Sequence, residues 1–169
     1  MKEKIQQQIF DEWLKKHKGL IFKILRAYAF TPMDREDLFQ DITIQLWHSI
    51  PKFRGDSAVA TWIYRVALNI AIKWIKKEQK TPRPESLEKA EHLLYENDFK
   101  MDDRLVWLYE QISQLSEIDR SITLLLLDDF SYKEMANILG ITESNIGVKI
   151  NRIKKQLIVK SKKYEHDGI

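Results

Sequence analysis

Apolar side chains recur at intervals of three and four residues along most of the chain, and this periodicity constrains the fold more than any other feature. One clear set is Val59, Ile63, Val66, Ile70 and Trp74. Such spacing brings side chains onto one face of an α-helix, whereas a half-buried strand would show strict alternation, which no segment has. Only 5 Gly and 4 Pro occur among 169 residues, so the chain has few of the turns that a β-sandwich needs. The sequence therefore predicts an all-α fold.

The first helices are expected near the N-terminus. Residues 5–29 should form one or two amphipathic helices, whose inner face comprises Ile9, Trp13, Leu20, Ile24 and Tyr28. Asp34 is the expected N-cap of the next helix, because its carboxylate can accept hydrogen bonds from free backbone N–H groups. That helix should end at Pro51, and its inner stripe is Leu38, Ile42 and Leu46.

A long third helix is predicted to run from a cap at Asp56 or Ser57 to about Lys77. Its polar face carries Arg65, Asn69, Lys73, Lys76 and Lys77. A row of cations beside aromatic rings that can stack on bases is typical of single-stranded nucleic acid binding. Trp62 and Trp74 could be such rings, but tryptophans at helical spacing are equally typical of a core. The pattern leaves both interpretations open.

Charge and composition divide the chain into two domains. Basic and acidic side chains number 15 and 9 in residues 1–80, 5 and 12 in residues 81–130, and 8 and 4 in residues 131–169. Periodicity weakens after Pro82 and Pro84, where glutamates dominate. We expect two small helical domains joined by an acidic linker, with boundaries at residues 1–78, 79–103 and 104–169. Basic domains on either side of an acidic segment favour a polyanionic partner.

The second domain carries the pattern of a helix-turn-helix. Ser131 and Glu134 have the spacing of a capping box, which marks a helix start. The small side chain of Ala136 allows a close helix crossing, Gly140 permits the positive φ of a tight turn, and Thr142 can cap a second helix. The inner face of this second helix is Ile146, Ile150, Ile153 and Leu157. This motif places a recognition helix in the major groove of DNA.

The opposite face of the second helix is polar. It carries Ser144, Asn145, Lys149, Asn151, Arg152 and Lys155. Amides and hydroxyls suit base edges, and the later cations suit phosphates. An ordinary helical hairpin with a solvated basic face is the alternative. Gly147 is unusual here, because glycine inside a helix costs about 1 kcal/mol relative to alanine.

The helix expected before residue 51 combines acidic and aromatic side chains, among them Asp37, Asp41 and Trp47. This combination favours a docking surface for a basic protein partner. A metal-dependent nuclease using Asp34, Asp37 and Asp41 is a second interpretation, but no histidine lies at ligand spacing and the chain has no cysteine. We therefore expect no catalytic residue, no metal and no cofactor.

Taken together, these motifs resemble bacterial RNA polymerase sigma factors of the extracytoplasmic-function group. Residues 34–47, 53–57 and 61–69 are similar to their second conserved domain, and residues 131–140 and 151–154 to their fourth. The resemblance covers roughly residues 10–78 and 104–158. Two departures stand out: Ile63 follows Trp62 where primary sigma factors have adjacent tryptophans, and Gly147 stands where many relatives carry a cation.

The resemblance implies a role for each group of residues. The helix that docks on core polymerase would use Asp37, Leu38, Gln40, Asp41 and Trp47. The loop that captures a flipped-out base of the non-template strand would use Phe53, Arg54, Asp56, Ser57 and Ala58. The helix that reads the minus-ten element would use Thr61, Trp62, Arg65, Asn69 and Lys73. The helix that reads the minus-thirty-five element would use Glu143, Ser144, Asn145, Lys149, Asn151, Arg152 and Lys155.

The implied function is that of a sigma factor, which directs core RNA polymerase to specific promoters and helps to melt them. The implied partners are core RNA polymerase, promoter DNA as duplex and as melted non-template strand, and an anti-sigma factor. The N-terminus has no apolar stretch of signal-peptide type and the longest apolar runs are far shorter than a membrane span, so we expect a cytoplasmic protein without membrane insertion. A stand-alone helix-turn-helix regulator that never contacts polymerase is the alternative.

Overall fold

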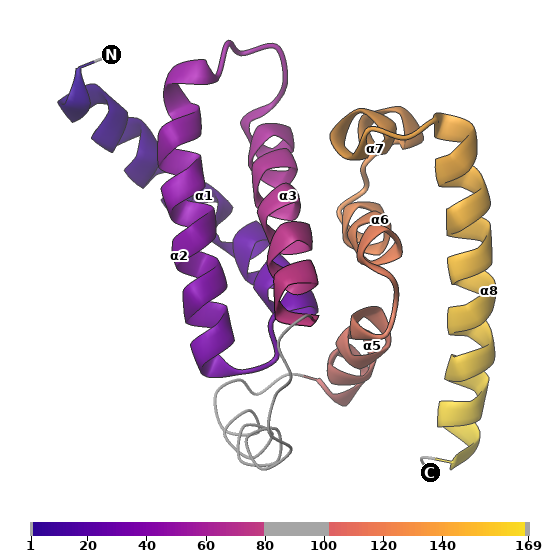
Figure 1. Ribbon diagram of the computed structural model, residues 1–169. Coiled ribbons are helices and arrows are strands. Elements are labelled where there is room, and N and C mark those ends of the chain that lie inside the picture. The colour runs from indigo at the N-terminus through magenta and orange to yellow at the C-terminus, as the bar shows by residue number, and fades with distance from the viewer. Residues whose placement is uncertain (1, 80–101, 168–169) are drawn as a thin grey trace. The chain divides into compact units, whose positions relative to one another are not determined.

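The computed structural model describes residues 2–79 and 102–167, and all of its regular elements within these ranges are helices (Figure 1). The chain divides into two compact units, Met1–Tyr109 and Glu110–Ile169. The division falls inside helix α5 (Asp103–Ser113). The prediction of an all-α, two-domain fold is therefore confirmed. The greater part of the predicted acidic linker, residues 80–101, lies outside the described residues.

The first unit is built on three helices that pack against one another. They are α1 (Glu3–Tyr28), α2 (Pro32–Ser49) and α3 (Val59–Gln79), and a short 3₁₀ turn, η1 (Ile50–Lys52), follows α2. In Figure 1, α2 and α3 run side by side and α1 crosses behind them, and all three pairs of helices are in contact. Fully buried side chains from all three helices form the core, including Ile24, Tyr28, Leu38, Ile42, Leu46, Ile63 and Leu68.

Helix α1 contains a break that separates two helical segments. His17 has φ −115° and ψ 16°, which are not helical values. One or two helices were expected in this region, and the structure has two helical segments that meet at a kink within α1. Of its predicted inner face, Trp13, Ile24 and Tyr28 are buried, whereas Ile9 and Leu20 are half-buried.

Helix α2 begins earlier than predicted, and its cap differs. Thr31 is the N-cap, because its Oγ1 accepts a hydrogen bond of 3.0 Å from the backbone N–H of Asp34. Pro32 occupies the first turn, where a missing N–H group costs nothing. The prediction that Asp34 caps the helix was wrong: this residue lies within the first turn, three positions after the cap, and is buried. The predicted inner stripe of Leu38, Ile42 and Leu46 is fully buried, as expected.

Helix α3 packs with a different face from the predicted one. Of the expected set only Ile63 is buried, while Val59, Val66, Ile70 and Trp74 are half-buried. The helix buries Tyr64, Ala67, Leu68, Ala71 and Ile75 instead. Because α3 packs on both α1 and α2, its buried face is broad, and two alanines allow close approach. At its start, the carbonyl of Ala58 accepts from the N–H of Trp62 at 3.1 Å. The helix therefore begins one residue after a cap at Ser57, or two after a cap at Asp56, would place it.

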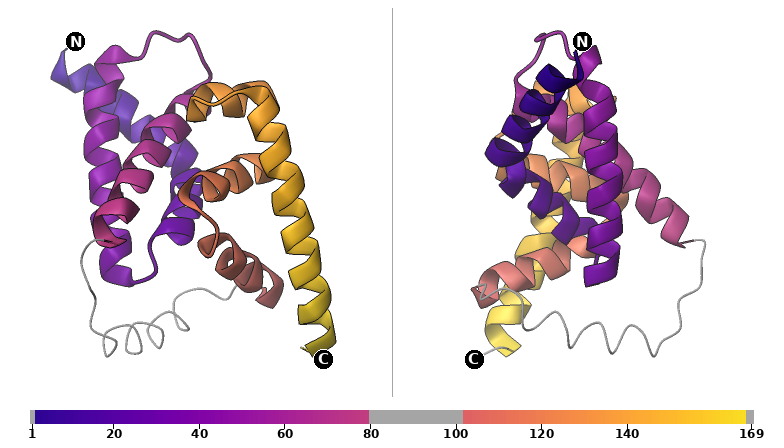
Figure 2. Two further views of the ribbon diagram at one scale, coloured as in Figure 1. Left: turned by 45° about the vertical axis from the view of Figure 1, so that its right-hand side comes forward. Right: turned by 90° about the vertical axis from the view of Figure 1, so that its left-hand side faces the viewer.

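The second unit contains the predicted helix-turn-helix. Helix α6 (Glu117–Leu127) precedes α7 (Tyr132–Leu139) and the long α8 (Glu143–Asp167), and both α6 and α7 pack on α8 (Figure 2). A capping box joins Ser131 and Glu134, as predicted. Gly140 has φ 70° and ψ 31°, the left-handed values that glycine adopts without strain.

The two helices of the motif meet through apolar side chains. Met135 and Ile138 of α7 are buried with Ile146, Ile150 and Ile153 of α8. Ala136, expected at the crossing, is half-buried, and so is Leu157. Thr142 Oγ1 accepts from the N–H of Asn145 at 3.1 Å, which confirms the second predicted cap. The opposite face of α8 is thereby left to solvent.

Candidate functional site

The outer face of α2 is acidic and exposed. Asp37, Gln40 and Asp41 are all exposed, on the side of the helix away from its buried stripe. Leu38 is completely buried, so the expected direct contact with a partner is not available to its side chain, which supports α2 from within. Three of the five residues assigned to docking thus share one solvent-facing surface.

Trp47, the last residue of that set, is half-buried because the N-terminal segment of α1 packs beside it. The ring of Phe10 meets the indole edge-on, with centroids 5.5 Å apart and an interplanar angle of 85°. Gln6 Nε2 donates to the Trp47 carbonyl at 2.8 Å. These contacts fix the end of α2, so Trp47 lies at the margin of the acidic surface.

Two apolar side chains on the same outer face were missed from the sequence. Met33 is 71% exposed and Ile44 is 57% exposed. Ile44 follows Asp37 by seven residues and Gln40 by four, so all three lie on one side of the helix. A helical projection centred on Asp37 would have found it. We define the α2 docking surface as Met33, Asp37, Gln40, Asp41 and Ile44.

The loop between η1 and α3 is anchored by aromatic packing. The Phe53 ring lies 5.3 Å from that of Trp13 and 5.4 Å from that of Trp62. Trp62 also donates from Nε1 to Ser49 Oγ at 3.0 Å. Phe53 and Trp62 are half-buried, so the interpretation of Trp62 as a packed side chain gains support over that of a free stacking platform.

The tip of this loop remains accessible. Arg54, Asp56 and Ala58 are exposed and Ser57 is half-buried. Gly55 between them has φ 79°, a value that favours glycine. The tip of the loop therefore exposes polar groups, while the packing of Phe53 fixes the start of the loop.

The polar stripe of α3 is only partly open to solvent. Asn69 and Lys73 are exposed, while Thr61 and Arg65 are half-buried. The Nε of Arg65 is buried and has no hydrogen-bond partner among the described residues. Unpaired buried donors are uncommon, since each loses its hydration without compensation. Asn69 and Lys73 are thus the most accessible of the expected minus-ten residues on this helix.

The outer face of α8 matches most of the predicted recognition residues. Exposed side chains along it are Glu143, Ser144, Asn145, Asn151, Arg152 and Lys155. Val148 is 64% exposed and lies among them, four residues after Ser144 and four before Arg152. Val148 is not among the predicted residues, because the apolar side chains of this helix are expected on its inner face. An exposed apolar group on a recognition helix suits the methyl group of thymine.

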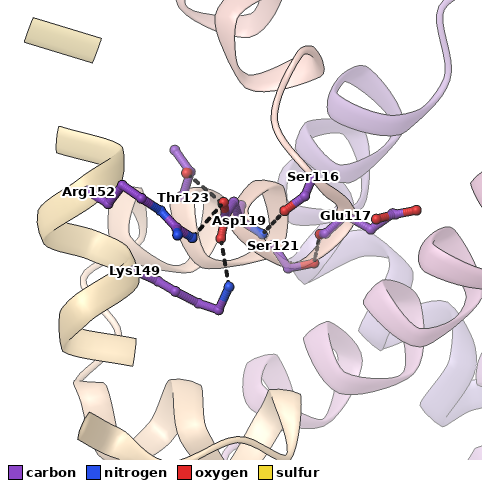
Figure 3. A network of polar contacts seen from close by, with 7 residues as sticks. All are labelled: Ser116, Glu117, Asp119, Ser121, Thr123, Lys149 and Arg152. Carbon is purple, nitrogen blue, oxygen red and sulfur yellow. Dashed lines mark hydrogen bonds and ion pairs between the residues drawn. The ribbon is translucent and has the colours of Figure 1, made fainter. Parts of the chain in front are cut away.

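Lys149 differs from the other predicted members of this face. It follows Ile146 by three residues and precedes Ile153 by four, so it borders the buried stripe of α8. Its side chain is 23% exposed, and its Nζ lies 3.4 Å from Asp119 Oδ1 of α6. Arg152 reaches the same carboxylate, with 3.6 Å between Nη2 and Oδ2, but its side chain is 55% exposed (Figure 3).

Other kinds of site find no support within residues 2–79 and 102–167. In these ranges no cluster of three or more His, Cys, Asp or Glu side chains could hold a metal ion. This finding disfavours the nuclease interpretation, and the burial of Asp34 disfavours it further. No helix in the described part of the chain is long and apolar enough to cross a membrane.

Comparison with known families and proteins agrees with the geometry of both units. Residues 13–81 match the family model Sigma-70 region 2, and residues 105–157 match Sigma-70, region 4. The ECF RNA polymerase sigma-E factor of Haemophilus influenzae is 27% identical over 171 residues, covering 92% of this chain and 90% of that protein. The sigma-E factor of Escherichia coli K12 is 23% identical, and the RNA polymerase sigma-H factor of Pseudomonas aeruginosa is 22% identical, each over 92% of this chain and 87% and 89% of its own length.

Solved structures show the same fold. The chain is similar to CnrH, solved in complex with the cytosolic domain of CnrY, with a TM-score of 0.66, 19% identity and coverage of 92% of this chain and 89% of that one. It is also similar to the sigma factor RpoE of Bartonella quintana, solved in complex with the anti-sigma factor NepR. That match has a TM-score of 0.66 and 17% identity, and it covers 89% of this chain and 94% of the other.

A helical first unit that matches sigma-70 region 2 and a second unit with a helix-turn-helix that matches region 4 define a two-domain transcription initiation factor of the sigma-70 type. The chain belongs to the extracytoplasmic-function group of RNA polymerase sigma factors. Sigma factors are not enzymes; they bind core RNA polymerase and promoter DNA, and the polymerase carries out the chemistry. The resemblance inferred from the sequence is confirmed.

Proposed function

We propose that the two domains divide the work of a sigma factor at the boundaries expected from the sequence. Residues 1–78 bind core polymerase and the minus-ten element, residues 104–169 bind the minus-thirty-five element, and residues 79–103 connect them. The family matches, residues 13–81 and 105–157, support this division at its centre and leave its edges as predictions. Both partners lie in the bacterial cytoplasm, so we assign the protein to that compartment.

The observation that carries the proposal is an exposed acidic face on one helix together with exposed cationic side chains on two others. Asp37 and Asp41 on α2 would repel DNA, whereas Lys73 on α3 and Arg152 on α8 would attract it. A stand-alone regulator has no use for the acidic surface, but a protein that docks on a basic polymerase element does. Gln40 and Ile44 extend this surface with a hydrogen-bonding group and an apolar contact.

In the first domain, the loop and α3 would hold melted DNA. Unstacking a base costs a few kcal/mol, which contacts with the extruded base must offset. Such contacts can come from the loop residues Arg54, Asp56, Ser57 and Ala58. The packing of Phe53 on Trp62 fixes the N-terminal end of this loop against α3. Thr61, Arg65, Asn69 and Lys73 would continue the contact surface along α3.

In the second domain, the exposed side of α8 would enter the major groove. Ser144, Asn145 and Asn151 suit base edges, Arg152 and Lys155 suit phosphates, and Glu143 begins the helix. Val148 joins this surface as an apolar contact. The DNA contact of Lys149 stays a prediction, because its ammonium group is paired with Asp119.

An inhibitory partner is a further expectation. RpoE of Bartonella quintana, which shares the fold, was solved with an anti-sigma factor. We propose that a protein of the same class controls this sigma factor.

Substitution of Asn69 tests the role of α3. Asn69→Ala should slow promoter opening by the reconstituted holoenzyme and leave binding to core polymerase intact, because the side chain is exposed and outside the α2 docking surface. Opening can be followed with permanganate footprinting of unpaired thymines on a promoter selected from a random library. Gln8→Ala, which removes an exposed amide from α1, is the matched control. A normal opening rate for Asn69→Ala would refute the assignment.

Arg152 tests the second domain in the same way. Arg152→Ala should weaken duplex binding uniformly across sequences and reduce the slope of log affinity against log salt by about one. An unchanged slope would remove Arg152 from the phosphate contacts.

A further inference from the structure

Asp119 of α6 lies behind the recognition helix and is held rigidly. Its backbone N–H donates to Ser116 Oγ, the N-cap of α6, at 3.3 Å, and its carbonyl accepts from Thr123 Oγ1 at 2.8 Å. Its side chain is only 13% exposed. The carboxylate therefore has a fixed position between α6 and α8 (Figure 3).

Each oxygen of this carboxylate faces one cation of α8. Oδ1 accepts from Lys149 Nζ at 3.4 Å, and Oδ2 lies 3.6 Å from Arg152 Nη2. Both contacts join residues about thirty positions apart in sequence, so they tie α6 to the recognition helix.

The two cations are engaged to different extents. Lys149 is 23% exposed, and an ammonium group acts as a single point of charge, so the pair with Asp119 occupies it. Arg152 is 55% exposed, and its guanidinium has five N–H donors, so one edge can face Asp119 while another faces solvent. The same carboxylate thus withdraws one cation and orients the other.

We propose that Asp119 is a positioning residue that sets how many cations the recognition helix offers to DNA. It keeps Lys149 away from the phosphates and directs Arg152 toward them. This inference rests on the proposed function of α8 as the reader of duplex DNA. The consequence is a weaker, less salt-dependent grip on DNA of any sequence, which leaves a larger share of discrimination to base contacts.

Loss of the carboxylate charge should release Lys149. Without a partner, the ammonium group is costly to keep half-buried, and the flexible lysine stem allows it to move into solvent beside the phosphates. Each additional phosphate contact steepens the salt dependence of binding by about 0.9 on a double-logarithmic plot. Asp119→Asn should therefore steepen the slope by about that amount.

The test measures binding of the full-length protein to a fluorescent duplex of mixed sequence over a range of salt concentrations. Asp119→Asn is compared with Asp129→Asn, which removes the same charge from an exposed turn of the same unit. Asparagine also tolerates the positive φ of 61° at position 129. We expect a steeper slope for Asp119→Asn and an unchanged slope for Asp129→Asn.

A second substitution identifies the released cation. In the Asp119→Asn background, Lys149→Gln should reverse the steepening, and its effect should be larger there than in the wild-type background. Thermal unfolding gives a reading that needs no DNA. The double variant should lose no more midpoint temperature than Asp119→Asn alone, because the Lys149–Asp119 contact that Lys149→Gln removes is already lost in Asp119→Asn.

The outcomes separate this inference from the function on which it rests. Intact binding with the same slope in wild type and Asp119→Asn, or additive losses of midpoint temperature, would overturn the role of Asp119. Failure of the wild-type protein to bind the duplex, alone and with core polymerase, would overturn the proposed function of α8 and this inference with it.

Discussion

Gly140 and Gly147 lie seven residues apart in the helix-turn-helix, yet the structure gives them opposite requirements. Gly140 adopts φ 70°, where an L side chain is strained. Gly147 lies within α8, and a Cβ added there would meet Tyr132 Cε2 at 3.5 Å, an ordinary contact. Of these two positions, only Gly140 therefore requires a glycine.

Alanine at each position should therefore shift stability in opposite directions. Gly147→Ala should raise the free energy of unfolding by about 0.5–1 kcal/mol, because alanine loses less backbone entropy in a helix. Gly140→Ala should lower it by about 1–2 kcal/mol through strain in the turn. Urea unfolding followed by circular dichroism measures both. Destabilisation by Gly147→Ala would show that the glycine has a packing role that the structure does not indicate.

His17, at the kink of α1, predicts a pH effect on stability. Partial burial, and secondarily the nearby charge of Lys16, hold the pKa of this imidazole below its ordinary value. The unfolded chain then binds the proton more tightly than the folded one, so His17 has no effect well above its ordinary pKa and destabilises the fold as the pH falls through that value.

The expected result is a fall in unfolding temperature between about pH 7.5 and about pH 5.5 that is smaller in His17→Gln than in wild type. His48→Gln, which changes an exposed histidine of α2, is the control. Equal pH dependence in all three proteins would exclude His17 as a source.

Single residues also show where sequence reasoning reaches its limit. Lys149 was predicted to lie on the outer face of its helix. Its pairing with Asp119 could not be predicted, because that contact depends on packing between segments thirty residues apart. Ile44 and Val148 were overlooked because apolar residues were assumed to point inward. A sequence gives the angular position of a side chain on a helix, but not the partner that meets it.

At the scale of helices, the buried face was predicted correctly where the apolar residues follow one clear period and wrongly where they do not. In helix α2 the apolar residues Leu38, Ile42 and Leu46 recur every four positions, and this buried face was predicted correctly. Helix α3 carries apolar residues on nearly all sides, so several choices of inner face fit equally well, and the predicted one was displaced. Cap residues followed the same rule: Ser131 and Thr142 have unambiguous motifs, whereas Thr31 and Asp34 both suit the start of α2.

The α2 docking surface gives a prediction for an entire element. Ile44→Ala should weaken binding to core polymerase about five- to tenfold, because an apolar group at the centre of a polar contact surface is desolvated on docking. The free energy of unfolding of this variant should differ from that of the wild type by less than about 0.5 kcal/mol, since the Ile44 side chain is 57% exposed. Binding can be measured by fluorescence anisotropy of labelled sigma factor.

Val159→Ala offers a matched control for this measurement. Val159 is 68% exposed on α8, outside both the α2 docking surface and the residues assigned to DNA. Equal affinities of wild type and Ile44→Ala would restrict the docking surface to its polar members.

At the scale of the whole molecule, the sequence predicted more than it did for any single helix. Two helical domains were predicted from periodicity and charge, and the helix-turn-helix from its caps and turn. Membership of the sigma factors was inferred from the resemblance of the motifs and their order, and all three predictions are confirmed. Motif order is robust because it does not depend on which face of a helix is buried. Domain edges are less well defined by sequence: α5 begins at Asp103, and the division between compact units lies within it.

Two weak DNA-binding domains bind a promoter more tightly when both are held on one scaffold. Core polymerase is that scaffold for a sigma factor, because binding of one domain to the promoter raises the effective concentration of the other there. The acidic surface on α2 is therefore the feature on which the whole account depends.

The most direct test is gel filtration of the purified protein with sigma-free core RNA polymerase. Wild type should co-elute with the enzyme, and a double variant, Asp37→Asn with Asp41→Asn, should not. Asp11→Asn with Glu12→Gln, which removes two exposed acids from α1, should behave as wild type. Failure of the wild-type protein to co-elute, while its duplex binding is intact, would contradict the account and favour a stand-alone regulator.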